Sequence, residues 1–342
     1  MGKFNTILTT LIFTLRSSRS KILGLDIESL RNNYDSWGPS ARVCITLTQD
    51  PGSVRGYEDS MVEAANELTM EHNDFANFTT LTTNKLFIVG PKSPSLRQES
   101  IVEFGTNRLR GYVARAYAKR DHAKRLSFYK TIRGHPLFGS PAGQMFEIYV
   151  LLWFWYSRAE EILPCTGAVA TSPHLEILAC PENLEFFPNP EGLKEVKEPE
   201  RPICWVPTLR TFASLDAFVL TDDTVITLQM TISRRHDANE VGFKRVFGNL
   251  PPNLLSKRPR RCHVFITDTD DYAKSLREQN LKEIPKGTFV YSAVIDINEL
   301  DSIVTETRVD KLEEARVSLY WLYCNFVFIE TFRHLHPMTP RM

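Results

Sequence analysis

Apolar and polar residues alternate along two short stretches that meet at a turn within residues 215–236, LDAFVLTDDTVITLQMTISRRH. A period of two predicts two β-strands, and the aspartate pair at residues 222–223 predicts the tight turn of an antiparallel hairpin. That turn places Asp216 directly opposite Gln229, with Thr231 on the same polar face. The other face is apolar and is predicted to lie in a core; it consists of Leu215, Ala217, Val219, Ile226, Leu228 and Met230.

Helices and strands are predicted on both sides of this hairpin. Residues 139–162 form an apolar stretch of helical length, with Ser140 as a cap and Pro141 in the first turn. The charged, proline-rich residues 188–202 and 251–261 predict exposed loops. Strands at residues 174–180, 184–187, 203–206, 262–267 and 288–297 alternate with helices at residues 240–247, 270–279 and 318–332.

The N-terminal part of the chain has a different pattern. Residues 40–67 predict a strand rich in β-branched residues, a Pro-Gly turn and then an amphipathic helix, and residues 77–90 add a strand or hairpin. The sequence contains no Gly-x-x-x-x-Gly-Lys-Ser/Thr stretch, the loop type that binds nucleotide phosphates. The whole pattern predicts an α/β protein whose smaller N-terminal region is mostly helical.

Residues 1–20 carry no acidic residue and contain a mildly apolar run at residues 7–15. Three interpretations stay open. The segment could be a secretory signal peptide cleaved near Ser18 and Ser20, a substrate for myristoylation at Gly2, or an amphipathic first helix, which we prefer. No other segment approaches the ~20 apolar residues that a membrane-spanning helix needs, so stable membrane insertion is not expected.

The charge of the chain points to local clusters, because 41 basic and 41 acidic residues cancel. Residues 108–133 contain nine lysines and arginines against one acid, Asp121, and predict a basic helical face. Such a face could track nucleic-acid phosphates, most directly through Lys119, Arg120, Lys124 and Arg125, or could simply be solvated. Residues 257–261, KRPRR, could form a nuclear import signal or a further phosphate contact.

The six cysteines, at positions 44, 165, 180, 204, 262 and 324, form no C-x-x-C pair and no short spacing with histidine. Neither a zinc module nor a disulfide framework is therefore predicted, and reduced, mostly buried thiols are expected.

An acid inside the apolar helix at residues 139–162 is the next candidate for chemistry. Glu147 stands among Met145, Phe146 and Ile148, so it either lies on a narrow exposed stripe with Gln144 and Arg158 or faces something that needs a carboxylate.

The order of a helix with Glu147, strands, a hairpin with Asp216 and Gln229-x-Thr231, a helix and a strand resembles the αβββαβ core of PD-(D/E)xK restriction-endonuclease-like nucleases. More narrowly, Ala142-Gly143-Gln144-Met145-Phe146-Glu147 and Gln229-Met230-Thr231-Ile232-Ser233, with His236 following, are similar to motifs of Crinkler effectors and retrotransposon hot spot proteins. Residues 41–68 are similar to the far end of the NTPase module that precedes this nuclease domain in that family.

The resemblance implies three parts of the chain: an extension at residues 1–40, an α/β and helical region at 41–125, and a restriction-endonuclease-like domain with a mixed central sheet at 126–342. It implies a metal-dependent nuclease acting on DNA, in which Glu147, Asp216 and Gln229 hold Mg²⁺ or Mn²⁺ over the scissile phosphate. It also implies an intracellular protein, with a nuclear location and secretion as an effector both open, and a separate NTPase or host protein as a further partner.

Thr231 stands where the family has a catalytic lysine, and a threonine cannot stabilise developing negative charge as an ammonium group does. Lys244 on the next helix could supply the missing charge, as could Arg245, and His236 could transfer a proton. The alternative hypothesis is a catalytically inactive nuclease fold that binds nucleic acid or a protein partner.

Overall fold

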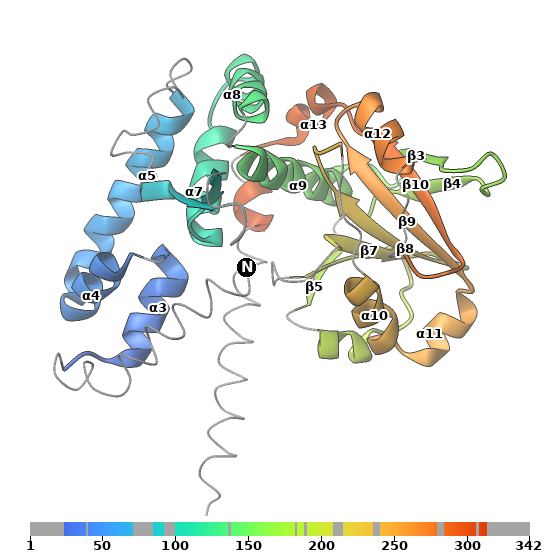
Figure 1. Ribbon diagram of the computed structural model, residues 1–342, viewed down its shortest axis with the longest axis horizontal. Coiled ribbons are helices and arrows are strands. Elements are labelled where there is room, and N and C mark those ends of the chain that lie inside the picture. Colours follow the sequence, from blue (N-terminus) through green and yellow to red (C-terminus); the bar gives the residue numbers. More distant parts are fainter. Residues whose placement is uncertain are drawn as a thin grey trace, which may run out of the picture. The chain divides into compact units, whose positions relative to one another are not determined.

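Figure 1 shows the computed structural model, which describes residues 24–312 except 39, 71–84, 92–99, 136–137, 182, 188–189, 208–214, 235–239, 279–283 and 306–307. The predictions for residues 1–20, for His236 and for the helix at residues 318–332 lie outside the described residues. The chain forms two units that divide between Met145 and Phe146.

The first unit consists mainly of helices joined by capped turns. Side-chain oxygens of Asp26, Ser40, Thr106 and Asp121 accept hydrogen bonds from backbone N–H groups at four helix starts. Its elements are α3 (Ile27–Trp37), α4 (Ala41–Gln49), a 3₁₀ turn (Pro51–Ser53), α5 (Val54–Met70), the β1 (Phe87–Pro91) and β2 (Ser100–Phe104) hairpin, α7 (Asn107–Ala118) and α8 (His122–Gly134). The helix within residues 40–67, the strand ending near residue 90 and the basic helices are confirmed.

The strand predicted at the start of residues 40–67 is wrong, because that segment is helix α4. Ser40 caps this helix by accepting a hydrogen bond from the Val43 N–H group, and Cys44 and Leu47, three residues apart, are its buried residues. Burial at a helical spacing and a good cap therefore outweigh the strand preference of the β-branched residues.

The second unit is built on an eight-stranded mixed sheet with the order β4-β3-β10-β9-β8-β7-β6-β5. Strands β8, β9 and β10 are parallel to one another, as are β5 and β6, and the other neighbours are antiparallel. The strands are β3 (Ile162–Gly167), β4 (Leu175–Leu178), β5 (Leu184–Phe187), β6 (Cys204–Pro207), β7 (Ala217–Leu220), β8 (Thr224–Met230), β9 (Arg260–Thr267) and β10 (Thr288–Val294). The predicted α/β class and mixed sheet are confirmed.

Helices and 3₁₀ turns connect these strands: α9 (Gly139–Tyr156), which crosses the boundary between the units, η4 (Pro190–Glu195), α10 (Glu240–Asn249), α11 (Pro252–Lys257), α12 (Asp270–Arg277) and α13 (Ile297–Ile303). Several predicted boundaries need correction. The strand predicted at residues 288–297 ends at Val294, and Ile297 begins α13. The exposed loop predicted before β6 contains η4, whose Leu193 is buried. Helix α9 ends at Tyr156, and Ile162 begins β3 instead. Residues 251–261, predicted as a loop, contain α11 because Leu254 is buried in the core.

The hairpin at the centre of the sheet has the predicted register. Ala217 pairs with Leu228, Val219 with Ile226 and Leu220 with Val225, and the Thr221 N–H group donates to the Thr224 carbonyl across the turn. The prediction that only one face is core is wrong, since every residue of β7 and β8 is buried.

The second face of the hairpin is covered by α10, α11 and η4. Phe218, Leu220 and Val225 on this face join a buried cluster with Phe243 and Val246 of α10; its other buried members are Phe187, Leu193, Trp205, Leu215, Leu250 and Leu254. Figure 1 shows α10 and α11 together beside the sheet. The polar residues of this face therefore lie beneath a helix.

None of the helices in the described residues is long and apolar enough to cross a membrane.

Candidate functional site

Asp216 lies immediately before β7, at the open end of the hairpin. Its carboxylate Oδ2 accepts a hydrogen bond of 2.6 Å from the Met230 N–H group, and its own N–H group donates to the Leu228 carbonyl at 3.0 Å. The side chain is half-buried. The regular pairing of β7 with β8 ends at Ala217 and Leu228, so Asp216 does not form the predicted pair with Gln229. The Asp216 carboxylate instead reaches the backbone of Met230 at the end of β8.

Gln229 and Thr231 lie beside Asp216 at the end of β8 and are almost fully buried, with 2% and 5% of their surface exposed. The Thr231 N–H group continues the pairing with β9 by donating to the Ile266 carbonyl at 2.9 Å. The Thr231 hydroxyl accepts a hydrogen bond of 3.1 Å from the Ser233 N–H group, which turns the chain away from the sheet. The structure thus brings Asp216, Gln229 and Thr231 together at the open end of the β7–β8 hairpin.

A buried histidine continues the polar row on this face. The Thr227 hydroxyl donates to the Cys262 carbonyl at 3.0 Å, so its contact of 3.0 Å with His263 Nδ1 requires that nitrogen to carry the proton. The His263 ring meets Phe243 of α10 and Phe265 at their edges. Sequence reasoning missed this residue, although a histidine inside the apolar run CHVFIT was a signal for it.

Glu147 comes from α9, where it is half-buried, as is Gln144 one turn earlier; the Gln144 amide donates to the Ser140 hydroxyl at 3.2 Å. Gln144 and Glu147 thus lie on a half-buried stripe of α9, as the first of the two interpretations of Glu147 expects. Among the described residues, no group of three or more histidine, cysteine, aspartate or glutamate side chains is arranged to hold a metal ion. The hairpin itself contributes the Asp216 carboxylate and the Gln229 amide, whose hard oxygen donors are of the type that suits Mg²⁺.

Lys244, named as a substitute for the missing lysine, is exposed on α10, as is Arg245. Both residues lie on the helix that covers the polar face of the hairpin, and both are exposed to solvent.

Two arginines of the predicted basic face bind helix ends within the first unit. Arg120 donates to the Asn66 carbonyl at 2.8 Å and to the Thr69 hydroxyl at 3.1 Å, at the end of α5. Arg125 donates to the carbonyl of Arg120 at 2.6 Å and to that of Ala118 at 3.4 Å, at the end of α7. Both arginines thus hydrogen-bond to groups in or just after the last turn of a helix, and these contacts stabilise the fold.

The two lysines of the same set have different positions. Lys119 and Lys124 are exposed, and Lys124 forms a surface ion pair of 2.9 Å with Asp121.

If this face contacts DNA, changing both lysines to glutamine should weaken binding and reduce the log-log salt slope by roughly one per lost contact, measured by fluorescence anisotropy. Changing Arg120 and Arg125 to glutamine should instead lower the melting temperature, because each loses hydrogen bonds of a charged group worth roughly 1.5–3 kcal/mol. An unchanged salt slope in the lysine variant would leave a solvated surface.

The second basic cluster also serves the fold. Arg258 is buried, and its guanidinium donates to the Thr221 carbonyl at 2.5 Å, to the Leu254 carbonyl at 3.3 Å and to the Glu198 carboxylate. Lys257 joins Glu198 at 3.0 Å. The hydrogen bonds from Arg258 and then Lys257 lower the pKa of Glu198 to about 2. This network ties the hairpin turn to Glu198, in the segment before β6, and to α11.

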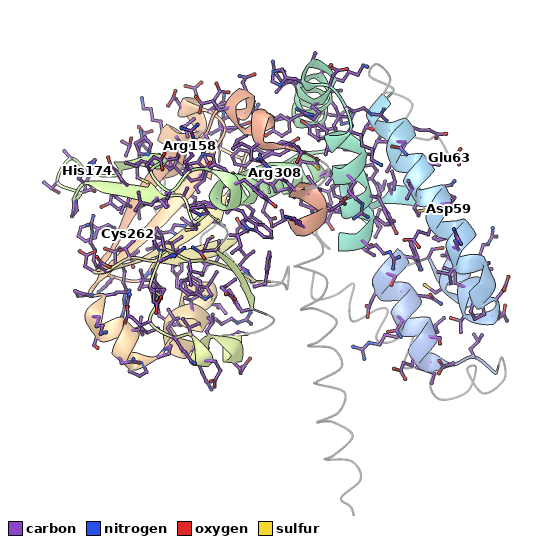
Figure 2. The ribbon with its side chains drawn as sticks, turned by 180° about the vertical axis from the view of Figure 1, so that it is seen from behind. Asp59, Glu63, Arg158, His174, Cys262 and Arg308 are labelled. Atoms are coloured by element: carbon purple, nitrogen blue, oxygen red, sulfur yellow. The ribbon has the colours of Figure 1, made fainter. Side chains whose placement is uncertain are left out.

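The remaining arginines of that cluster have partners too. Arg260 donates to the His174 carbonyl at 2.9 Å, and Figure 2 shows His174 on the β3–β4 hairpin. Arg261 lies over the Phe247 ring at 4.6 Å.

The described cysteines are free thiols, and all except the half-buried Cys165 are buried, as predicted. Burial raises the pKa of Cys165 and Cys180 to about 12 and that of Cys44 and Cys262 to about 11. Thiols of such high pKa are poor nucleophiles and metal ligands at neutral pH.

These features define an α/β protein with a polar site at the open end of a central hairpin. Comparison of the chain with models of protein families, with curated proteins and with solved structures finds no match.

Proposed function

We propose that the second unit is a restriction-endonuclease-like domain that hydrolyses phosphodiester bonds of DNA with the help of a divalent cation. The observation that carries the proposal is the Asp216 carboxylate, held at 2.6 Å by the Met230 N–H group at the end of the strand that bears Gln229 and Thr231. A carboxylate fixed by the backbone beside an amide oxygen offers ligands of the type that Mg²⁺ and Mn²⁺ prefer.

The order of elements supports the proposal. Helix α9, strands β6, β7 and β8, helix α10 and strand β9 occur in the order αβββαβ that the similarity to PD-(D/E)xK nucleases implies. Additional elements interrupt this order: β3, β4, β5 and η4 lie between α9 and β6, and α11 lies between α10 and β9. In this order Asp216 precedes the second strand, Gln229 and Thr231 end the third, and Glu147 lies on the first helix.

A bound cation would polarise the scissile phosphate and lower the pKa of a water nucleophile. The chain's own part is to orient Asp216 through the Met230 N–H group and to surround the site with buried residues, which strengthens electrostatic interactions there. Thr231 contributes a hydroxyl where the nucleases that this order of elements resembles have a cation. The expected activity is therefore low and needs millimolar metal, because two carboxylates and an amide bind the ion weakly.

A second candidate function is binding without catalysis. It is favoured by the burial of Gln229, of which 2% is exposed, and by the internal contacts of Arg120, Arg125 and Arg258, since these groups then serve the fold. In that case the nuclease fold would present other surfaces to nucleic acid or to a protein partner.

Metal binding distinguishes the two functions. Millimolar Mn²⁺ or Mg²⁺ is expected to raise the melting temperature of the wild-type chain by binding only its folded state, and Asp216→Ala should remove this rise. Leu178→Ala, at an exposed position of edge strand β4, is the matched control and should keep it. Equal responses of wild type and Asp216→Ala to metal would contradict a cation site at Asp216 and leave binding as the function.

A further inference from the structure

The chain that leaves the candidate site runs directly to an arginine that lies over an aromatic ring. After the turn fixed by the Thr231 hydroxyl, the Arg234 carbonyl accepts a hydrogen bond of 2.9 Å from the Ser275 hydroxyl of α12. The exposed Arg234 guanidinium lies 5.3 Å from the centre of the Tyr272 ring, also on α12. The backbone of Arg234 and its side chain are thus both held against the same helix.

This pair lies on the same face of the sheet as Gln229. The connections β8–α10–β9 and β9–α12–β10 advance in one direction across parallel strands, and right-handed crossovers place both helices on one face. A contact agrees with this placement: Arg277 of α12 donates to the Ser292 hydroxyl, and Ser292 pairs with Phe265, the partner of Gln229.

The pair is also close to the site. Arg234 is three positions after Thr231, so their Cα atoms are at most about 11 Å apart. Gln229 and Ser292 lie two strands apart in one row, which corresponds to about 10 Å. Arg234 therefore lies within about 11 Å, between Cα atoms, of the residue that follows β8, at the end of the sheet that carries the Asp216 carboxylate.

We propose that Arg234 and Tyr272 form a subsite for a phosphate and the neighbouring base of the DNA strand, a role that rests on the proposed function of the second unit. A guanidinium donates to phosphate oxygens in a fixed fork, and stacking on Tyr272 orients that fork. The aromatic ring offers a surface for a base. The subsite supplies positive charge beside a hairpin whose Thr231 provides none.

The experiment measures binding of a short fluorescein-labelled single-stranded DNA to the full chain by anisotropy, in EDTA so that neither metal binding nor cleavage contributes. Arg234→Gln should raise the Kd roughly tenfold at low salt and reduce the salt slope by about 0.7, the value for one phosphate contact on a single strand. Tyr272→Ala should weaken binding several-fold, and Tyr272→Phe should bind like wild type because the ring remains.

Arg201→Gln is the matched control, because Arg201 is exposed and precedes β6 at the opposite end of the sheet; it should leave Kd and slope unchanged. Equal Kd and slope for Arg234→Gln and Arg201→Gln would overturn the subsite, as would a wild-type chain that does not bind the DNA. Loss of binding in Arg234→Gln in a chain that shows no cleavage with metal would uphold the subsite while removing the catalytic function. Unchanged melting temperatures of both variants exclude unfolding as the cause.

Discussion

Replacing Leu228 with aspartate is expected to abolish cooperative folding of the second unit. Leu228 is fully buried in β8, where it pairs with Ala217 of β7 on one side and Val264 of β9 on the other. An unpaired carboxylate at this position costs several kcal/mol, and the lost leucine contacts add about 2–5 kcal/mol. Since domains are stable by about 5–15 kcal/mol, the sum approaches the whole stability.

The measurement is thermal unfolding followed by circular dichroism and calorimetry, with Leu178→Asp as the control. Leu178 lies on edge strand β4 and is 42% exposed, so an aspartate there remains in contact with water and should leave the transition nearly unchanged. A cooperative transition of normal enthalpy in Leu228→Asp would contradict the burial of the β8 face that carries Leu228.

The hairpin was the most predictable part of this fold because its determinants are local. The alternation of residues 217–220 and 224–230 and the Asp-Asp turn between them fix the register, and the paired residues agree with it. What alternation cannot reveal is whether the polar face is also covered, since that depends on α10, whose Phe243 and Val246 come from another part of the chain.

Local preference was misleading where burial at a longer spacing decides the structure. The segment Ala41–Gln49 is rich in β-branched residues, yet it is a helix. Ser40 caps the start of this helix, and its buried residues, Cys44 and Leu47, have a helical spacing. The loop predicted at residues 251–261 likewise becomes a helix because Leu254 enters the core. These outcomes depend on tertiary contacts that no window of sequence contains.

Basic residues were the least predictable part of the candidate site. A count of lysines and arginines treats all of them as surface charge, but Arg120 and Arg125 bind carbonyl groups at helix ends and Arg258 is buried against the hairpin turn. Arginine has five donors on a long side chain, so its partners lie far from it in sequence. The contact of Arg234 with Tyr272 could not be predicted for the same reason, because the two residues are far apart in the sequence and come together when α12 packs.

Asp216→Asn is expected to reduce metal-dependent cleavage of DNA by about a hundredfold or more while the chain stays folded. The substitution removes one of two negative charges from the proposed cation site, and the electrostatic stabilisation that a bound cation supplies is worth several kcal/mol. The asparagine oxygen can still accept the hydrogen bond from the Met230 N–H group, so the end of the hairpin should keep its geometry. Cleavage of plasmid and single-stranded DNA in Mn²⁺, with melting curves for each variant, measures both effects.

Gln229→Glu should act in the opposite direction on metal binding. Without metal the new carboxylate is buried beside Asp216, where burial and repulsion raise its pKa and lower stability. With Mn²⁺ between the two carboxylates this repulsion is offset, so the rise in melting temperature should exceed that of wild type.

Thr231→Lys adds the missing cation at the end of β8, from which a long side chain can extend to the edge of the sheet, and should raise the cleavage rate. If neither the wild type nor the Gln229→Glu/Thr231→Lys double variant cleaves DNA or RNA in any metal, the binding function is the one that stands.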